Sequence, residues 1–80
     1  MKIQVEITRR PGLRDPEGAT AARALRDLGF TSVSDVHFGR SIVVEVDGDD
    51  RDQALTDVED MCRKLLANPV LEDFTVEVLD

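Results

Sequence analysis

The stretch Lys64-Leu-Leu-Ala-Asn-Pro-Val-Leu-Glu-Asp-Phe74 marks the point where the chain changes from one kind of secondary structure to another. Apolar residues recur at i, i+3, i+4 and i+7 up to this point, which predicts an amphipathic helix over residues 51–67. Asn68 readily adopts the left-handed conformation that ends a helix, and Pro69 prevents its continuation. Apolar and polar residues then alternate over 72–79, so the helix is followed by a half-buried strand.

The same alternation predicts three more strands, at 2–9, 33–38 and 41–47. The strand at 33–38 is the least regular of the three. Gly39-Arg40 is typical of a tight connection, and it would join the second and third strands into a hairpin.

A first helix is predicted to begin with Asp15 as N-cap and Pro16 at the first helical position, and to end at Gly29. The order of elements is then βαββαβ. This order is typical of an α+β protein with the two-layer ferredoxin-like plait, in which two helices cover one face of an antiparallel sheet. The length of 80 residues predicts a single domain spanning 1–80.

Charge and composition exclude several kinds of partner. The formal net charge of −7 argues against nucleic acid and against an anionic membrane surface, because both need a basic patch. No apolar run is long enough to span a membrane. The chain begins with an alternating strand and not with a signal peptide, and its single cysteine, Cys62, allows no internal disulfide. We therefore expect a cytoplasmic protein.

A chain this short buries only about 60–65% of its unfolded surface, so its core is thin. The predicted sheet also leaves one face and its edge strands open, and such surfaces are natural docking sites. We therefore expect self-association into a homodimer, and a tetramer is compatible with the same surfaces.

No self-contained active site is evident in the sequence. The loop at 11–18 lacks the Cys-x-x-Cys pair of a metal carrier, and the predicted first and third strands lack the aromatic side chains that stack on RNA bases. His37 has no neighbouring nucleophile or carboxylate that would make it a general base. Cys62 lies on an apolar helix face, where packing is its expected role. Such a chain is expected to act by binding.

Three segments together resemble one protein family. Pro11-Gly-Leu-Arg-Asp-Pro-Glu-Gly18 is similar to the Pro-Gly-Val-x-Asp-Pro-x-Gly loop of the small PurS subunit of phosphoribosylformylglycinamidine synthase. Ala24-Leu-Arg-Asp-Leu-Gly-Phe30, with the Val-x-x-Val and Gly39-Arg40 that follow, resembles a second run of that family, although Arg40 stands where Lys is usual. Met61-Cys-Arg-Lys-Leu-Leu-Ala-Asn-Pro-Val-Leu-Glu-Asp-Phe74 resembles a third run. The likeness covers the whole chain.

The resemblance implies an accessory subunit in the fourth step of purine synthesis, where formylglycinamide ribonucleotide (FGAR), glutamine and ATP become formylglycinamidine ribonucleotide (FGAM). It implies two partners, a large ATP-dependent synthetase subunit and a glutaminase subunit, between which the small subunit supports ammonia transfer. ATP or ADP, magnesium and glutamine would be bound in the assembled complex. No catalytic residue, cofactor or metal is expected in this chain alone.

The residues predicted to contact partners come from the loop and from the end of the second helix: Pro11, Gly12, Arg14, Asp15, Gly18, Arg40, Lys64 and Asn68. Arg14, Arg40 and Lys64 would form charge-assisted bonds with partner carboxylates. Asn68 is explained equally well as a helix cap, and Gly12 and Gly18 as backbone turns.

Two other functions remain open at this point. One is a regulatory plait that binds an amino acid at a dimer interface. The other is a small hydrolase of the acylphosphatase type, for which Arg14 and Gly18 lie in the appropriate loop, although the glycine pattern of a phosphate-binding loop is weak.

Overall fold

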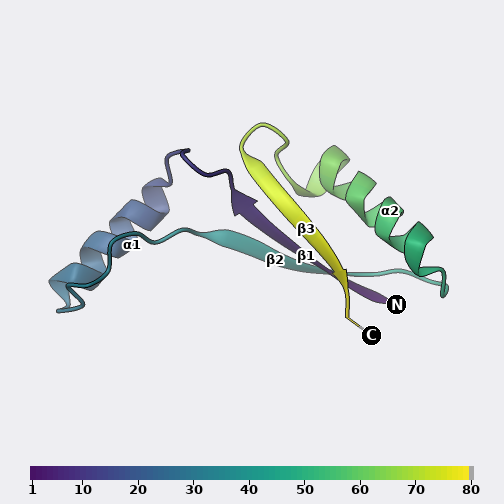
Figure 1. Ribbon diagram of the computed structural model, residues 1–80, viewed down its shortest axis with the longest axis horizontal. Helices are drawn as coiled ribbons and strands as arrows, with labels where there is room; N and C mark the ends of the chain where they lie inside the picture. Colours follow the sequence, from purple (N-terminus) through teal and green to yellow (C-terminus); the bar gives the residue numbers. More distant parts are fainter. Residues whose placement is uncertain (80) are drawn as a thin grey trace.

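The computed structural model describes residues 1–79 and contains a three-stranded antiparallel sheet and two helices (Figure 1). The strands are β1 (Lys2–Arg9), β2 (Gly39–Glu45) and β3 (Glu72–Val78), and their order in the sheet is β2-β1-β3. The helices are α1 (Pro16–Asp27) and α2 (Arg51–Met61), and α2 continues into a π-helical turn, η1 (Cys62–Leu66). The α+β class with an antiparallel sheet is confirmed.

The core lies between the sheet and α2. Ile3, Val5 and Ile7 alternate along the central strand β1 and are completely buried, because β2, β3 and α2 surround that face. Val58 and Cys62 pack on them from the helix side and are also fully buried. The opposite face of the sheet is open to solvent.

The predicted strand at 33–38 is wrong, and Gly39-Arg40 is the start of β2 and not a connection. Residues 33–38 belong to no strand, and three of their backbone groups bond to the side chains of Arg26 in α1 and of Asp15, its N-cap. Arg26 Nη1 donates to the carbonyl oxygens of Val33 at 3.0 Å and Ser34 at 3.3 Å, and the Phe38 N–H donates to Asp15. Because side chains satisfy these groups locally, the segment has no need of a sheet partner.

The position of α1 also differs from the expectation. Figure 1 shows α1 beyond one end of the sheet, on the side of the molecule opposite α2, and no residue of α1 belongs to the hydrophobic core cluster. Only α2 covers the sheet. The chain is therefore elongated, with extents of 49 × 27 × 14 Å and a radius of gyration of 16.1 Å, where a compact chain of this length has about 12 Å.

None of the described helices is long and apolar enough to cross a membrane.

Candidate interaction site

Residues 10–38, which we call the arm, form a projecting unit that Asp15 holds together. Asp15 is the N-cap of α1, and its Oδ1 accepts a hydrogen bond from the Gly18 N–H at 2.9 Å. Its Oδ2 accepts a second bond, also 2.9 Å long, from the Phe38 N–H. These two backbone donors hold the pKa of the Asp15 carboxyl below its ordinary value, because they stabilise the charged form. One carboxylate thus joins the start of α1 to the residue before β2.

Gly18 allows α1 to lie directly on residues 33–38, the segment that leads back from α1 to β2. A Cβ at this position would stand 1.9 Å from the carbonyl oxygen of Val36, so no larger residue fits without displacing the backbone. Gly12, in contrast, has open space around it and a φ of +83°, and its role is to turn the loop. Backbone geometry therefore accounts for both glycines.

Both ends of the arm are fastened to the sheet. Arg10 donates from Nη2 to the carbonyl oxygen of Pro69 at 2.6 Å and forms an ion pair with Asp73 at 3.3 Å, and its N–H bonds to the carbonyl of Leu71. The other end runs directly into β2 after the bond between Phe38 and Asp15. The arm consequently leaves the sheet in a defined direction.

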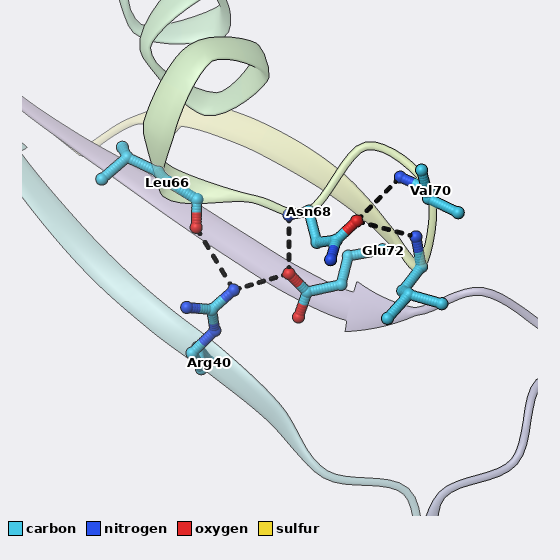
Figure 2. A network of polar contacts seen from close by, with 6 residues as sticks. Arg40, Leu66, Asn68, Val70 and Glu72 are labelled. Carbon is cyan, nitrogen blue, oxygen red and sulfur yellow. Dashed lines mark hydrogen bonds and ion pairs between the residues drawn. The ribbon is translucent and has the colours of Figure 1, made fainter.

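A second group of residues forms a polar corner, made of Arg40, Leu66, Asn68 and Glu72 (Figure 2). Arg40 Nη2 donates to the carbonyl oxygen of Leu66 at 3.2 Å and pairs with Glu72 Oε1 at 2.6 Å. The same Glu72 oxygen accepts the Asn68 N–H at 2.8 Å. The polar corner therefore ties together β2, the end of η1 and the start of β3.

The prediction that Asn68 ends the helix in the left-handed conformation is wrong, because no described residue other than glycine has a positive φ; Asn68 instead caps the following turn with its side chain. Its Oδ1 accepts hydrogen bonds from the N–H groups of Val70 at 2.9 Å and Leu71 at 3.3 Å, as Figure 2 shows for Val70. This Asx-type turn carries the chain from η1 into β3.

Glu72 is central to the polar corner but was not among the residues predicted from the sequence. The alternation of side chains along the strands could have identified Glu72, because it shows on which face of the sheet each residue lies. Arg40 pairs with Ile7 in the sheet and Glu72 shares the parity of Phe74, so both charged side chains stand on the helix-covered face. A charged residue on that face needs a partner of opposite charge, and here each supplies the other.

Lys64 lies elsewhere, at the rim of an apolar groove between α2, η1 and β2. Val44, Met61, Leu65 and Leu66 form the apolar part of this groove, and Asp57, Asp60 and Lys64 line its rim. The apolar periodicity that predicted a helix over 51–67 places Leu65 on its core side, but 82% of Leu65 is exposed. The π turn explains the difference: the Ala67 N–H bonds to the carbonyl of Cys62, five residues back, and the extra residue rotates Leu65 outward.

The structure thus divides the predicted contact residues among three places. Pro11, Gly12, Arg14, Asp15 and Gly18 belong to the arm, Arg40 and Asn68 to the polar corner, and Lys64 to the apolar groove. Asp15 and Arg40 line one hollow between the arm and the sheet, together with Arg9, Glu17 and Glu72. Lys64 is not part of that hollow.

The hollow and the apolar groove present charged and apolar side chains at the surface. Within residues 1–79, no group of three or more His, Cys, Asp or Glu side chains could hold a metal ion. Burial raises the pKa of the Cys62 thiol and so keeps it protonated and unreactive. His37 is exposed.

A small α+β plait with a projecting arm and an open sheet face defines a protein that acts through its surfaces. The PurS family model, described as phosphoribosylformylglycinamidine (FGAM) synthase, matches residues 2–80. The PurS subunit of phosphoribosylformylglycinamidine synthase from Methanocaldococcus jannaschii is 40% identical over 77 residues, which are 96% of this chain and 93% of the relative. The chain belongs to the PurS family of FGAM synthase subunits.

Solved structures support the same assignment. A Bacillus subtilis PurS crystal structure is 34% identical, covers 99% of this chain and 98% of its own, and has a TM-score of 0.87. A chain in the structure of PurLQS from Thermotoga maritima is 35% identical, with coverages of 98% and 95% and the same TM-score. The comparisons favour a synthase subunit over the regulatory plait that binds an amino acid.

Proposed function

We propose that this chain is the small assembly subunit of FGAM synthase, a carbon–nitrogen ligase that uses glutamine as amido donor in purine synthesis. It joins a large ATP-dependent synthetase subunit to a glutaminase subunit and supports the transfer of ammonia between them. The full-length match to the PurS family carries this proposal, and a family member in the T. maritima PurLQS structure supports the association with two other kinds of subunit.

The catalytic groups and ligands belong to the partners in this proposal. ATP or ADP, magnesium and glutamine bind in the assembled complex, and the reaction converts FGAR to FGAM there. The surfaces described above support a role in binding partners, because they offer charged and apolar contacts. The chain works in the cytoplasm as a single PurS-type domain and as a homodimer.

Arg14 and Lys64 are the two cations that we assign to direct contact with partner carboxylates. Both are exposed, and neither has a hydrogen bond or ion pair to any residue in the part of the chain that the structure describes. Both are therefore available for charge-assisted bonds. Arg40 and Asn68 act differently in this proposal, by holding the polar corner in the shape that a partner meets.

A genetic experiment tests the proposal. Deletion of the gene is expected to create a requirement for purine, which the intact chain restores and the Arg14→Ala, Lys64→Ala double variant restores poorly. Asp49→Ala, on the turn before α2, serves as the matched surface control and is expected to restore growth fully. Growth of the deletion strain without purine would contradict the proposal.

A further inference from the structure

A pocket with a volume of about 340 Å³, which we call the arm pocket, lies between α1 and residues 33–38. Its basic side chains are those of Arg14, Arg23, Arg26 and His37, and its acidic side chains are those of Asp15 and Asp35. The Asp15 carboxylate is already engaged by the backbone N–H groups of Gly18 and Phe38. The arm pocket therefore offers more free cations than free carboxylates.

Charge is divided unevenly between the arm and the rest of the chain. Residues 10–38 contain four arginines and four carboxylates and are neutral overall, so the net charge of −7 falls on the remaining residues. The sheet and α2 consequently repel an acidic partner, whereas the arm does not. The arm pocket is the part of this neutral unit where a negatively charged segment is best accommodated.

The arginines of the arm pocket have donors to spare. Arg14 and Arg23 have no hydrogen bond or ion pair among residues 1–79. Arg26 uses Nη1 for the carbonyl oxygens of Val33 and Ser34, and its Nε and Nη2 have no partner in the same range. Arg23 and Arg26 are three residues apart on α1, which places their Cβ atoms about 5–6 Å from each other. A carboxylate between them can accept from both guanidinium groups and relieves the repulsion of the two charges.

The walls of the arm pocket are held in place by contacts within the arm. The close approach of Gly18 to the carbonyl oxygen of Val36 sets α1 against the facing segment. Asp15 fixes one end of that segment through the Phe38 N–H, and Arg26 fixes the other through its two carbonyl acceptors. A site formed in advance loses less conformational entropy when its ligand binds.

Asp35 distinguishes a peptide from a phosphate-rich ligand as the occupant. This exposed carboxylate has no hydrogen bond or ion pair in the part of the chain that the structure describes. An ionised carboxylate only accepts hydrogen bonds, so it needs a donor from the occupant. A phosphate group supplies oxygen acceptors alone, whereas an acidic peptide supplies carboxylates for the arginines and backbone N–H groups for Asp35.

We propose that the arm pocket receives an acidic segment of one of the two partner subunits, whose carboxylates bond to Arg14, Arg23 and Arg26. This inference rests on the proposed function and deepens it, because it places Arg14 in a group of three arginines that act together. The segment lies along the side of α1 that faces residues 33–38.

Zero-length cross-linking in the assembled complex tests this inference. Arg23→Lys keeps the positive charge and places a primary amine at the arm pocket. The variant is combined with the synthetase and glutaminase subunits in the presence of ATP, magnesium and glutamine, and then treated with a water-soluble carbodiimide, which joins an amine directly to a carboxylate. We expect mass spectrometry to show a link from position 23 to an Asp or Glu of a partner subunit. Ala24→Lys is the control, because Ala24 is exposed on the same helix but does not line the arm pocket, and it should give no link to that segment.

Binding measurements give a second readout. Arg23→Gln should raise the dissociation constant between the chain and the mixed subunits about tenfold or more, because it removes a charge-assisted bond, and the difference should shrink at high salt. Arg63→Gln changes the net charge equally but removes only surface pairs with Glu59 and Asp60, so it should leave the constant unchanged. The inference is overturned by equal constants for the two variants, by the absence of the link from position 23, or by a link from there to a second copy of this chain.

Failure of this inference is distinguishable from failure of the proposed function. If the chain binds the two subunits but position 23 neither links to them nor affects the dissociation constant, only the role of the arm pocket is wrong. If the unaltered chain binds neither subunit, the proposed function is wrong and the assignment of the arm pocket fails with it.

Discussion

Substitution of Gly18 by alanine should detach the arm's helix from its returning segment. An alanine Cβ would stand 1.9 Å from the carbonyl oxygen of Val36, and ordinary contact begins near 3.4 Å, so the two must separate by about 1.5 Å. A shift of this size breaks the 2.9 Å hydrogen bond from the Phe38 N–H to Asp15. Forcing an extra carbon into a packed site costs about 1–3 kcal/mol.

Alanine has an opposing advantage, because it is favoured over glycine within a helix by about 1 kcal/mol. The net expectation is a loss of about 0–2 kcal/mol in the free energy of unfolding, or a fall in Tm of up to about 15 °C for a domain of this size. Urea denaturation at fixed protein concentration measures the loss, and amide hydrogen exchange should show faster exchange at Phe38. Ala24→Gly, on the exposed side of the same helix, is the matched control and measures the propensity difference alone.

The reasoning fails if Gly18→Ala stabilises the protein by about as much as Ala24→Gly destabilises it. That result would mean that helix propensity alone governs position 18 and that the close approach to Val36 is absent in solution.

Three other predictions concern the polar corner, the core and Asp15. Glu72→Ala should lower the free energy of unfolding by about 1–2 kcal/mol, because Arg40 and the Asn68 N–H lose the oxygen that accepts from both. Glu77→Ala, at an exposed position of the same strand, is the control and should change the free energy little when both are measured by urea denaturation. Val58→Ala, at a fully buried position, should cost about 2 kcal/mol in the same assay, and an unchanged midpoint would refute its place in the core. Because the folded-state pKa of Asp15 is depressed, its stabilising effect is present above the ordinary value of 3.8 and is lost as the pH falls below it through the lower folded pKa. The stability difference between the natural chain and Asp15→Ala, measured by acid titration, should therefore be full at neutral pH and shrink below pH 3.8; a difference that grew there would contradict the assignment.

The sequence was most informative where one residue determines local geometry. Asp15 and Pro16 were expected to begin a helix, and Asn68 and Pro69 to end one, and the structure confirms both boundaries to within about a residue. The alternation over 2–9 matches β1 residue for residue, because a strand buried on one face leaves a strict period of two.

The sequence was misleading where a local bond competes with the regular pattern. The apolar residues at 33–38 suggested a strand, but Arg26 and Asp15 capture the backbone groups that a sheet would use. The helical periodicity through Leu65 was clear, yet a single π turn moved that side chain to the surface. Neither the side-chain bonds to residues 33–38 nor the π turn can be predicted from the spacing of apolar residues.

The candidate site was predictable only in part for a similar reason. The loop at 11–18 was identified from its glycines and prolines, but the role of Asp15 in joining the two ends of the arm depends on a contact between residues 23 positions apart. Glu72 could have been found from its parity in β3. The projection of α1 away from the sheet could not, because the pattern of apolar residues does not say whether a helix is buried by its own chain or by another.

Reconstitution of FGAM synthase from separate subunits tests the central claim most directly. The purified chain is combined with the synthetase and glutaminase subunits, and FGAM formation from FGAR is measured with ATP, magnesium and either glutamine or ammonia. We predict that glutamine-dependent synthesis requires the chain, whereas synthesis from free ammonia proceeds without it. Equal glutamine-dependent rates in the presence and absence of the chain would contradict the account.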